Sequence, residues 1–104
     1  MMINQSTWRY PGLENEELGG MSDVGRIVLD AQALGVLPED QQCTNWTYGE
    51  IQNLYDQVDK AWQPYGHMVS RMPPDMQERH ARVYSAMIDR AKERGWDPEL
   101  DHEG

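Results

Sequence analysis

Three histidines and one cysteine are the side chains of this sequence best suited to acid–base, nucleophilic or metal chemistry. The histidines, His67, His80 and His102, lack the four-residue spacing that presents a histidine pair to a metal ion on a helix. Cys43 lies in a polar segment without a neighbouring basic residue to stabilise a thiolate. A nucleophilic Cys43 would require His67 or His80 to fold against it. The pattern predicts no metal site and no cofactor, and whether these side chains meet depends on the fold.

Carboxylates form a second group of candidate functional residues. Glu14, Glu16 and Glu17 lie close together near the N-terminus, and Asp56 and Asp59 lie on a predicted helix. Paired acids can catalyse proton transfer when burial separates their pKa values. These acids lie in polar runs, which is typical of a solvated face. Such a face can imitate nucleic-acid phosphates and would attract a basic protein surface.

The aromatic residues are unusual because all of them carry a polar group: the chain has four Trp and five Tyr but no Phe. Trp, Tyr and Met are enriched at the centres of protein interfaces. They would equally fill the core of a small protein, where each indole N–H or hydroxyl needs a partner. On the first interpretation, five aromatic side chains are the predicted partner contacts, with the carboxylates above as an acidic rim. They are Trp8, Tyr10, Trp46, Tyr48 and Trp96.

Length and charge restrict the class of function. A chain of 104 residues suffices for one small domain. Its net charge of -9, from 18 acidic and 9 basic residues, argues against direct contact with nucleic acid, which needs a basic face. The same charge disfavours anionic membranes, and no stretch approaches the roughly 18 apolar residues of a membrane span. A single cysteine and the lack of a secretion-signal pattern predict an intracellular, cytoplasmic protein.

The elements expected to position these residues are helices, of which the clearest spans 74–94. Pro74 suits its first turn, and Gly95 suits the left-handed position after its last turn, over which Trp96 can fold back. We expect this helix to organise the fold, because apolar residues recur along it every three or four positions. These residues are Met76, His80, Val83, Tyr84, Met87, Ile88 and Ala91.

Two further helices are predicted at 23–34 and 48–63. Ser22 is the expected N-cap of the first of them. Gly25, in its first turn, either weakens the helix or permits a close backbone approach. The second helix follows a capping box at Thr47–Glu50. Both helices carry apolar residues at helical spacing and should pack on the third.

The remaining segments are predicted to be connectors and ends. Pro64 should stop or kink the second helix, after which 65–72 can form a short continuation. Residues 1–12 are expected to form an extended arm, and 97–104 a short acidic tail. No segment shows the two-residue alternation of a strand. The predicted fold is therefore all-α: a three-helix bundle in a single domain over 13–96, with an arm and a tail.

The sequence HARVYSAMIDRAKERGW at 80–96 is similar to a helix of phage-type pyrimidine-dimer DNA glycosylases that ends in Arg-Gly-aromatic. Gly66 and His67 before it, and Leu13 with Leu18 far upstream, occur in a similar order. These motifs cover only part of the chain. The resemblance implies a helical scaffold.

The chemistry of that family depends on residues that this chain lacks. The family uses the amine of a processed N-terminal Thr as its nucleophile and a Glu on its first helix. Here Met2 follows Met1, and Met2 is too bulky for ordinary removal of the first Met. Residues 21–24, where the acid should lie, have the sequence Met-Ser-Asp-Val, and the basic DNA face is missing. The resemblance thus implies a related scaffold without the activity.

These observations together predict a small, acidic, non-enzymatic module that binds another protein. Proteins of this kind are common among phage and mobile-element accessory proteins, some of which inhibit host nucleic-acid enzymes. The expected partner is therefore the basic, nucleic-acid-binding surface of a host protein. The alternative is an assembly subunit, in a homo-oligomer or a larger complex, with Met and Trp faces packed as permanent core. A helical enzyme, or an inactive relative of the glycosylase scaffold, is a third hypothesis.

Overall fold

The computed structural model describes residues 7–17 and 19–96. Most of this part of the chain forms three helices: α1 (Asp23–Ala33), α2 (Tyr48–Trp62) and α3 (Pro74–Glu93). Short 3-10 turns lie at Leu13–Asn15, Gln63–Tyr65 and Val69–Arg71. The predicted all-α class is confirmed, and each helix ends one residue before its predicted limit. No helix in the described part of the chain is both long and apolar enough to span a lipid bilayer.

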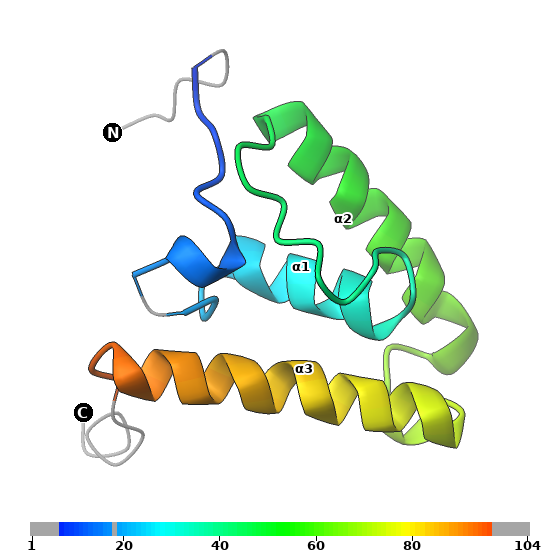
Figure 1. Ribbon diagram of the computed structural model, residues 1–104. Helices are drawn as coiled ribbons and strands as arrows, with labels where there is room; N and C mark the ends of the chain where they lie inside the picture. The colour runs from blue at the N-terminus through cyan, green and yellow to red at the C-terminus, as the bar shows by residue number, and fades with distance from the viewer. Residues whose placement is uncertain (1–6, 18, 97–104) are drawn as a thin grey trace, which may run out of the picture.

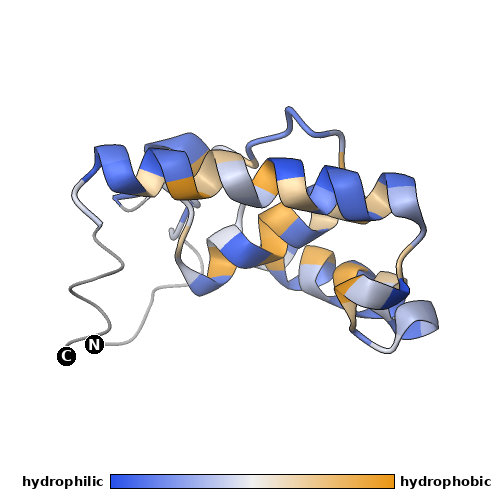
Figure 2. Ribbon diagram, turned by 90° about the horizontal axis from the view of Figure 1, so that it is seen from below, coloured by the Kyte–Doolittle hydropathy of each residue, from blue (hydrophilic) through white to orange (hydrophobic). Residues whose placement is uncertain are grey.

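The middle element of the bundle is α1. It packs against both α2 and α3, which approach it from different sides (Figure 1). Val28 and Leu29 of α1 are completely buried, whereas α3 buries only three of its 20 residues. The apolar positions of the helices turn toward a shared interior (Figure 2). The expectation that 74–94 organises the fold is therefore corrected: the longest helix covers one side, and Ile88 of its predicted stripe is exposed.

All three helices begin as the sequence predicts. The Ser22 hydroxyl accepts a hydrogen bond from the Gly25 N–H at 2.9 Å. Thr47 and Glu50 complete the capping box, each side chain accepting from the other residue's backbone N–H, at 3.1 and 2.9 Å. Pro74 occupies the first turn of α3, where its missing N–H leaves no bond unmade. These caps satisfy N–H groups that the helices themselves cannot pair.

The C-termini of α1 and α3 share one motif. Gly35 and Gly95 follow the two helices with positive φ angles of 79° and 102°. The Trp96 N–H then donates to the Ala91 carbonyl at 3.0 Å, and an equivalent bond follows Gly35. This is the six-to-one bond of the Schellman motif, which needs the left-handed conformation that glycine adopts at little cost. The chain at Trp96 therefore folds back over the last turn of α3, as predicted.

The described part of the predicted arm, residues 7–12, is extended and joins the loop before α2. The Tyr10 N–H donates to the Trp46 carbonyl at 2.9 Å, and the Asn45 N–H donates to the Tyr10 carbonyl at 2.7 Å. The Tyr10 side chain enters the core and is 3% exposed. This segment is therefore part of the folded domain. Residues 1–6 and the predicted tail at 97–104 lie outside the described residues.

The connector between α2 and α3 changes direction in two 3-10 turns, which replace the short helix expected at 65–72. Pro64 lies in the first of these turns, directly after the end of α2. Gly66 and His67 both have a φ of 60°, which is uncommon for a histidine. This backbone conformation turns the chain so that His67 returns to the last turn of α2.

Candidate functional site

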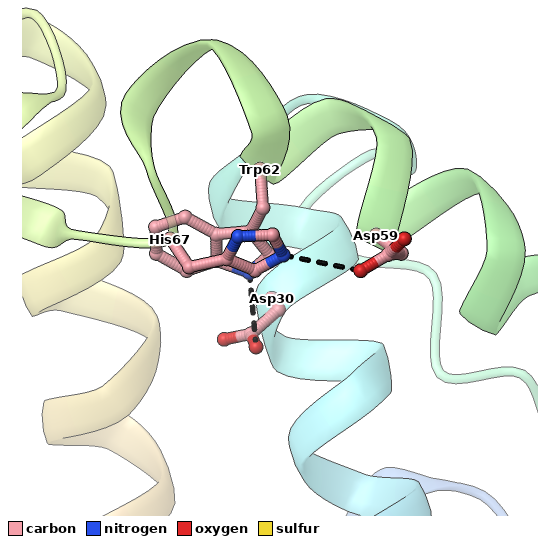
Figure 3. Close-up of polar contacts among 4 residues, drawn as sticks. All are labelled: Asp30, Asp59, Trp62 and His67. Carbon is pink, nitrogen blue, oxygen red and sulfur yellow. Dashed lines mark hydrogen bonds and ion pairs between the residues drawn. The ribbon is translucent and has the colours of Figure 1, made fainter.

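A groove between α1 and α2 gathers carboxylate and aromatic side chains at the surface. Its volume is about 190 Å³. Figure 3 shows its polar members, with Asp30 on α1, Asp59 and Trp62 on α2, and His67 on the connector. The seven lining residues are Ile27, Asp30, Tyr55, Val58, Asp59, Trp62 and His67. We call this site the α1–α2 groove.

Asp30 links all three helices at one end of the groove. Its carboxylate accepts a hydrogen bond from the Tyr84 hydroxyl of α3 at 2.5 Å and a longer one from the Trp62 indole N–H of α2 at 3.4 Å. Burial, reinforced by this hydrogen bond, raises the pKa of Tyr84 well above its ordinary value. Both donors are neutral groups, so they orient the Asp30 carboxylate without cancelling its charge.

His67 lies over Trp62 at the other side of the groove. The two rings are stacked, with centroids 6.0 Å apart and planes inclined by 17°. The imidazole Nε2 lies 3.1 Å from Asp59 Oδ1. Both side chains are about half exposed, at 53% and 50%, so this contact adds little to stability. The left-handed backbone conformation of His67 is energetically unfavourable for a residue other than glycine. It places the imidazole ring over Trp62.

His80 approaches the same cluster from α3. Its ring stacks on Tyr84 with centroids 4.4 Å apart, and its plane makes an edge contact with Trp62 at 6.5 Å. Burial lowers the pKa of His80, and the nearby Asp30 charge opposes that effect only in part. At neutral pH, His80 is therefore an uncharged aromatic packing partner of Tyr84 and Trp62.

Cys43 does not join the histidines. It is completely buried, and burial raises the pKa of its thiol to about 11. The ring contacts and hydrogen bonds of His67 and His80 go instead to Asp59, Trp62 and Tyr84. A thiol with this pKa stays protonated at neutral pH, which removes its nucleophilic form. Among the described residues, no group of three His, Cys, Asp or Glu side chains is arranged to hold a metal ion.

Two predicted partner contacts, Tyr10 and Glu16, are corrected because both are buried, at 3% and 8% exposed. The Tyr10 hydroxyl donates a hydrogen bond directly to the Glu16 carboxylate. Burial and this bond raise the pKa of Tyr10 far above its ordinary value. The pair fixes the predicted arm to the domain, because a buried carboxylate needs a donor. Neither residue can belong to an exposed acidic rim.

The other predicted contacts are accessible but lie in several places. Trp8 packs between Tyr10 and Tyr48, with ring centroids 6.3 and 6.1 Å apart. Trp46 lines a small hollow beside α2, on the side away from the α1–α2 groove. Only Asp59 lies in the groove itself. The remaining four are partly or fully exposed elsewhere on the surface: Glu14, Glu17, Asp56 and Trp96.

Sequence reasoning missed most of the groove. The helical spacing of Tyr55, Val58 and Trp62 predicts only an apolar face for the helix at 48–63, and no motif marks Asp30. One available signal is Asp30 itself, the single charged residue in the mainly apolar run from Ile27 to Leu34. A carboxylate in such a position is held there by specific donors. The identity of those donors, on two other helices, depends on tertiary packing.

A larger cavity of about 390 Å³ lies between α3 and the segment around Asp40. Charges of both signs line it, and Arg82 pairs across it with Glu39 at 2.9 Å. Arg90, also in its lining, donates to the Gly19 carbonyl at 3.2 Å. Because the guanidinium groups of Arg82 and Arg90 already have hydrogen-bond partners, they are less available to bind a ligand. The α1–α2 groove is therefore the better candidate site.

Comparisons of the chain with protein-family models, curated proteins and solved structures find no match. The resemblance to pyrimidine-dimer glycosylases therefore depends only on the residues quoted for it. Of these, 80–96 form most of α3 and its C-terminal motif. Gly66 and His67 form the left-handed turn beside Trp62. Asp23, in the region where the family has its acid, is exposed in the first turn of α1.

Proposed function

We propose that this protein is a small, acidic, non-enzymatic module that binds a basic surface of another protein. The proposal is supported by the placement and pairing of the acidic and basic side chains. Among the described residues, Arg79, Arg90 and Arg94 donate to backbone carbonyls, whereas most acidic side chains are exposed and form no ion pair. A protein with this distribution presents an uncompensated negative field to its surroundings.

These three arginines lie on α3 or at its C-cap, and each donates to a backbone carbonyl of another segment. Arg79 donates from Nε to the Ala33 carbonyl at 2.9 Å, which ties α3 to the end of α1. Arg94 donates to the Glu16 carbonyl at 2.5 Å, and Arg90 donates to the segment before α1. Hydrogen bonds to backbone carbonyls satisfy a guanidinium group without involving an acidic side chain. These three arginines thus hold α3 in place and leave surface acids unpaired.

The acidic side chains are mostly free of such pairing. In the described part of the chain, ion pairs join only Arg82 with Glu39 and His67 with Asp59. Exposed acids without an ion pair remain on every main helix, including Asp23, Asp56 and Asp89. Unpaired exposed charge favours fast, salt-sensitive association with a surface of opposite sign.

The partner we propose is a nucleic-acid-binding protein, whose basic groove such a field would attract. The test is affinity capture from lysate at low salt, followed by a salt gradient and competition with duplex DNA and RNA. We expect a basic protein that leaves the column at moderate salt and is displaced by nucleic acid. A partner retained through about 0.5 M salt, where exposed charges are strongly screened, would contradict the proposal.

The alternative of an assembly subunit has less support. Three large apolar side chains are conspicuously exposed in the described residues: Tyr55, Met68 and Ile88. They come from α2, the connector and α3, and they do not form one helix face. Obligate interfaces normally bury a broad apolar surface. A sharp oligomer mass at low concentration, insensitive to salt, would favour this alternative.

A further inference from the structure

We propose that the α1–α2 groove binds one arginine side chain of the basic partner surface, with Asp30 and Asp59 as its anionic contacts. This inference rests on the proposed function and specifies where on the acidic surface the partner is held. It commits to arginine because the groove combines two carboxylates with flat aromatic and aliphatic walls. Guanidinium groups bind carboxylates through planar N–H forks and stack on aromatic faces.

The charge of the groove is the first argument. Asp30 accepts hydrogen bonds from two neutral donors, Tyr84 and Trp62, and forms no ion pair with a basic side chain of the described residues. Each carboxylate oxygen has a second lone pair, which leaves acceptor capacity for a ligand. Asp59 is half exposed and contacts only the edge of the His67 imidazole. Arg26, one turn before Asp30, is exposed and does not line the groove, although its charge is near enough to Tyr84 to oppose the rise in the pKa of that tyrosine.

The shape and lining of the groove are the second argument. At about 190 Å³ it is smaller than the roughly 300–1,000 Å³ typical of small-molecule sites, which suits a single inserted side chain. Ile27 and Val58 provide apolar surface for the methylene stem of an arginine. Tyr55 is 52% exposed and presents a ring on which a guanidinium group can stack.

His67 supplies the third argument, because this lining residue shows that the wall of the groove already holds a planar nitrogen-bearing group between an aromatic ring and a carboxylate. It is a planar group with ring nitrogens, stacked on Trp62 and close to an Asp59 oxygen. A guanidinium group needs the same two features, a flat aromatic or imidazole surface and a carboxylate at its edge. The fold thus places the components of a cation site around an open volume.

The experiment is an NMR titration of ¹⁵N-labelled protein with an acetylated, amidated tetra-arginine peptide at low salt. The matched variants are Asp59→Asn and Asp56→Asn, which remove the same charge from exposed positions on α2. Asp59→Asn should weaken binding about ten-fold, the usual effect of losing one charge-assisted hydrogen bond, and Asp56→Asn by less than about two-fold. The Trp62 indole N–H resonance should move on binding, and tetra-lysine should bind more weakly than tetra-arginine.

Equal losses in the two variants, with a stationary Trp62 indole resonance, would show that binding is spread over the acidic surface. That result would overturn this inference and leave the proposed function standing, whereas failure of the capture assay would count against both. Equal binding of tetra-lysine would overturn the choice of arginine. Asp59 is half exposed, so its variant should fold, and the amide spectrum would verify this.

Discussion

At the scale of single residues, two tyrosine–carboxylate pairs organise the molecule. Tyr10 donates to Glu16 beside the N-terminal segment, and Tyr84 donates to Asp30 at the meeting point of the three helices. In these pairs, Glu16 is buried and Asp30 is partly buried, and each carboxylate receives a hydrogen bond from a neutral donor. An acid so placed orients its surroundings, and removal of the donor leaves a poorly solvated charge.

The first prediction concerns the Tyr10 hydroxyl. Tyr10→Phe should destabilise the protein by about 1–3 kcal/mol, because Glu16 would keep its buried carboxylate but lose its donor. The loss should appear as a lower urea midpoint with an unchanged m-value. As a control, Tyr55→Phe removes a hydroxyl from an exposed ring and should change stability by less than about 0.5 kcal/mol. Equal effects in the two variants would mean that the Tyr10–Glu16 bond contributes nothing specific.

At the scale of elements, Gly25 fixes how α1 enters the bundle. A side chain at this position would lie 2.7 Å from the Glu16 carboxylate and closer still to the Gly20 carbonyl. The first turn of α1 therefore packs directly on the backbone of the preceding segment. Of the two predicted roles for this glycine, a weak helix or a close approach, the structure supports the close approach.

The second prediction compares two glycines in the first turns of helices. Gly25→Ala should destabilise the protein by about 1–3 kcal/mol, since the new methyl group has no room. In Gly49→Ala, on α2, the new methyl group would lie 4.0 Å from the Thr47 hydroxyl and therefore has room. This substitution should stabilise the protein by up to about 1 kcal/mol, because alanine has a higher helix propensity than glycine. Thermal and urea denaturation of both variants would measure the contrast. A stabilised Gly25→Ala would show that α1 can move away from Gly20 at little cost.

At the scale of the whole molecule, negative charge is the dominant property. The net charge is -9, and few of the exposed acids in the described residues are paired with a base. Mutual repulsion of these acids opposes the compact state. The exposed acids therefore lower the free energy of unfolding. The same acids attract cationic groups, which fits the proposed binding function.

The third prediction follows from this repulsion. Raising NaCl from about 0.01 M to about 0.15 M shortens the screening length from roughly 30 Å to roughly 8 Å, so the protein should become more stable. The urea midpoint should rise with salt at constant pH while the m-value stays the same. A fall in the midpoint would mean that the two surface ion pairs outweigh the repulsion, contrary to the small value expected of exposed pairs.

The sequence alone determined the class of fold and the ends of the helices. Ser22, the Thr47–Glu50 box, Pro74 and Gly95 act through neighbours within a few residues, so their roles follow from local chemistry. Helical spacing of apolar residues likewise identified most inward positions, although Ile88 of the predicted stripe is exposed. The net charge, a simple sum over the chain, indicated the kind of partner to expect.

Only the tertiary structure decided which polar residues meet. Asp30 and Tyr84 are separated by 54 positions, and Trp62 reaches Asp30 from 32 positions away. Their contact depends on the angles at which α2 and α3 cross α1, which no local pattern encodes.

Burial also depends on tertiary packing: Tyr10 and Glu16 resemble surface residues in the sequence, yet both are buried. The backbone of Tyr10 pairs with the loop before α2, and the Glu16 carboxylate lies between Tyr10 and the first turn of α1. The groove exists because packing α2 and the connector residue His67 against α1 leaves an open volume between them.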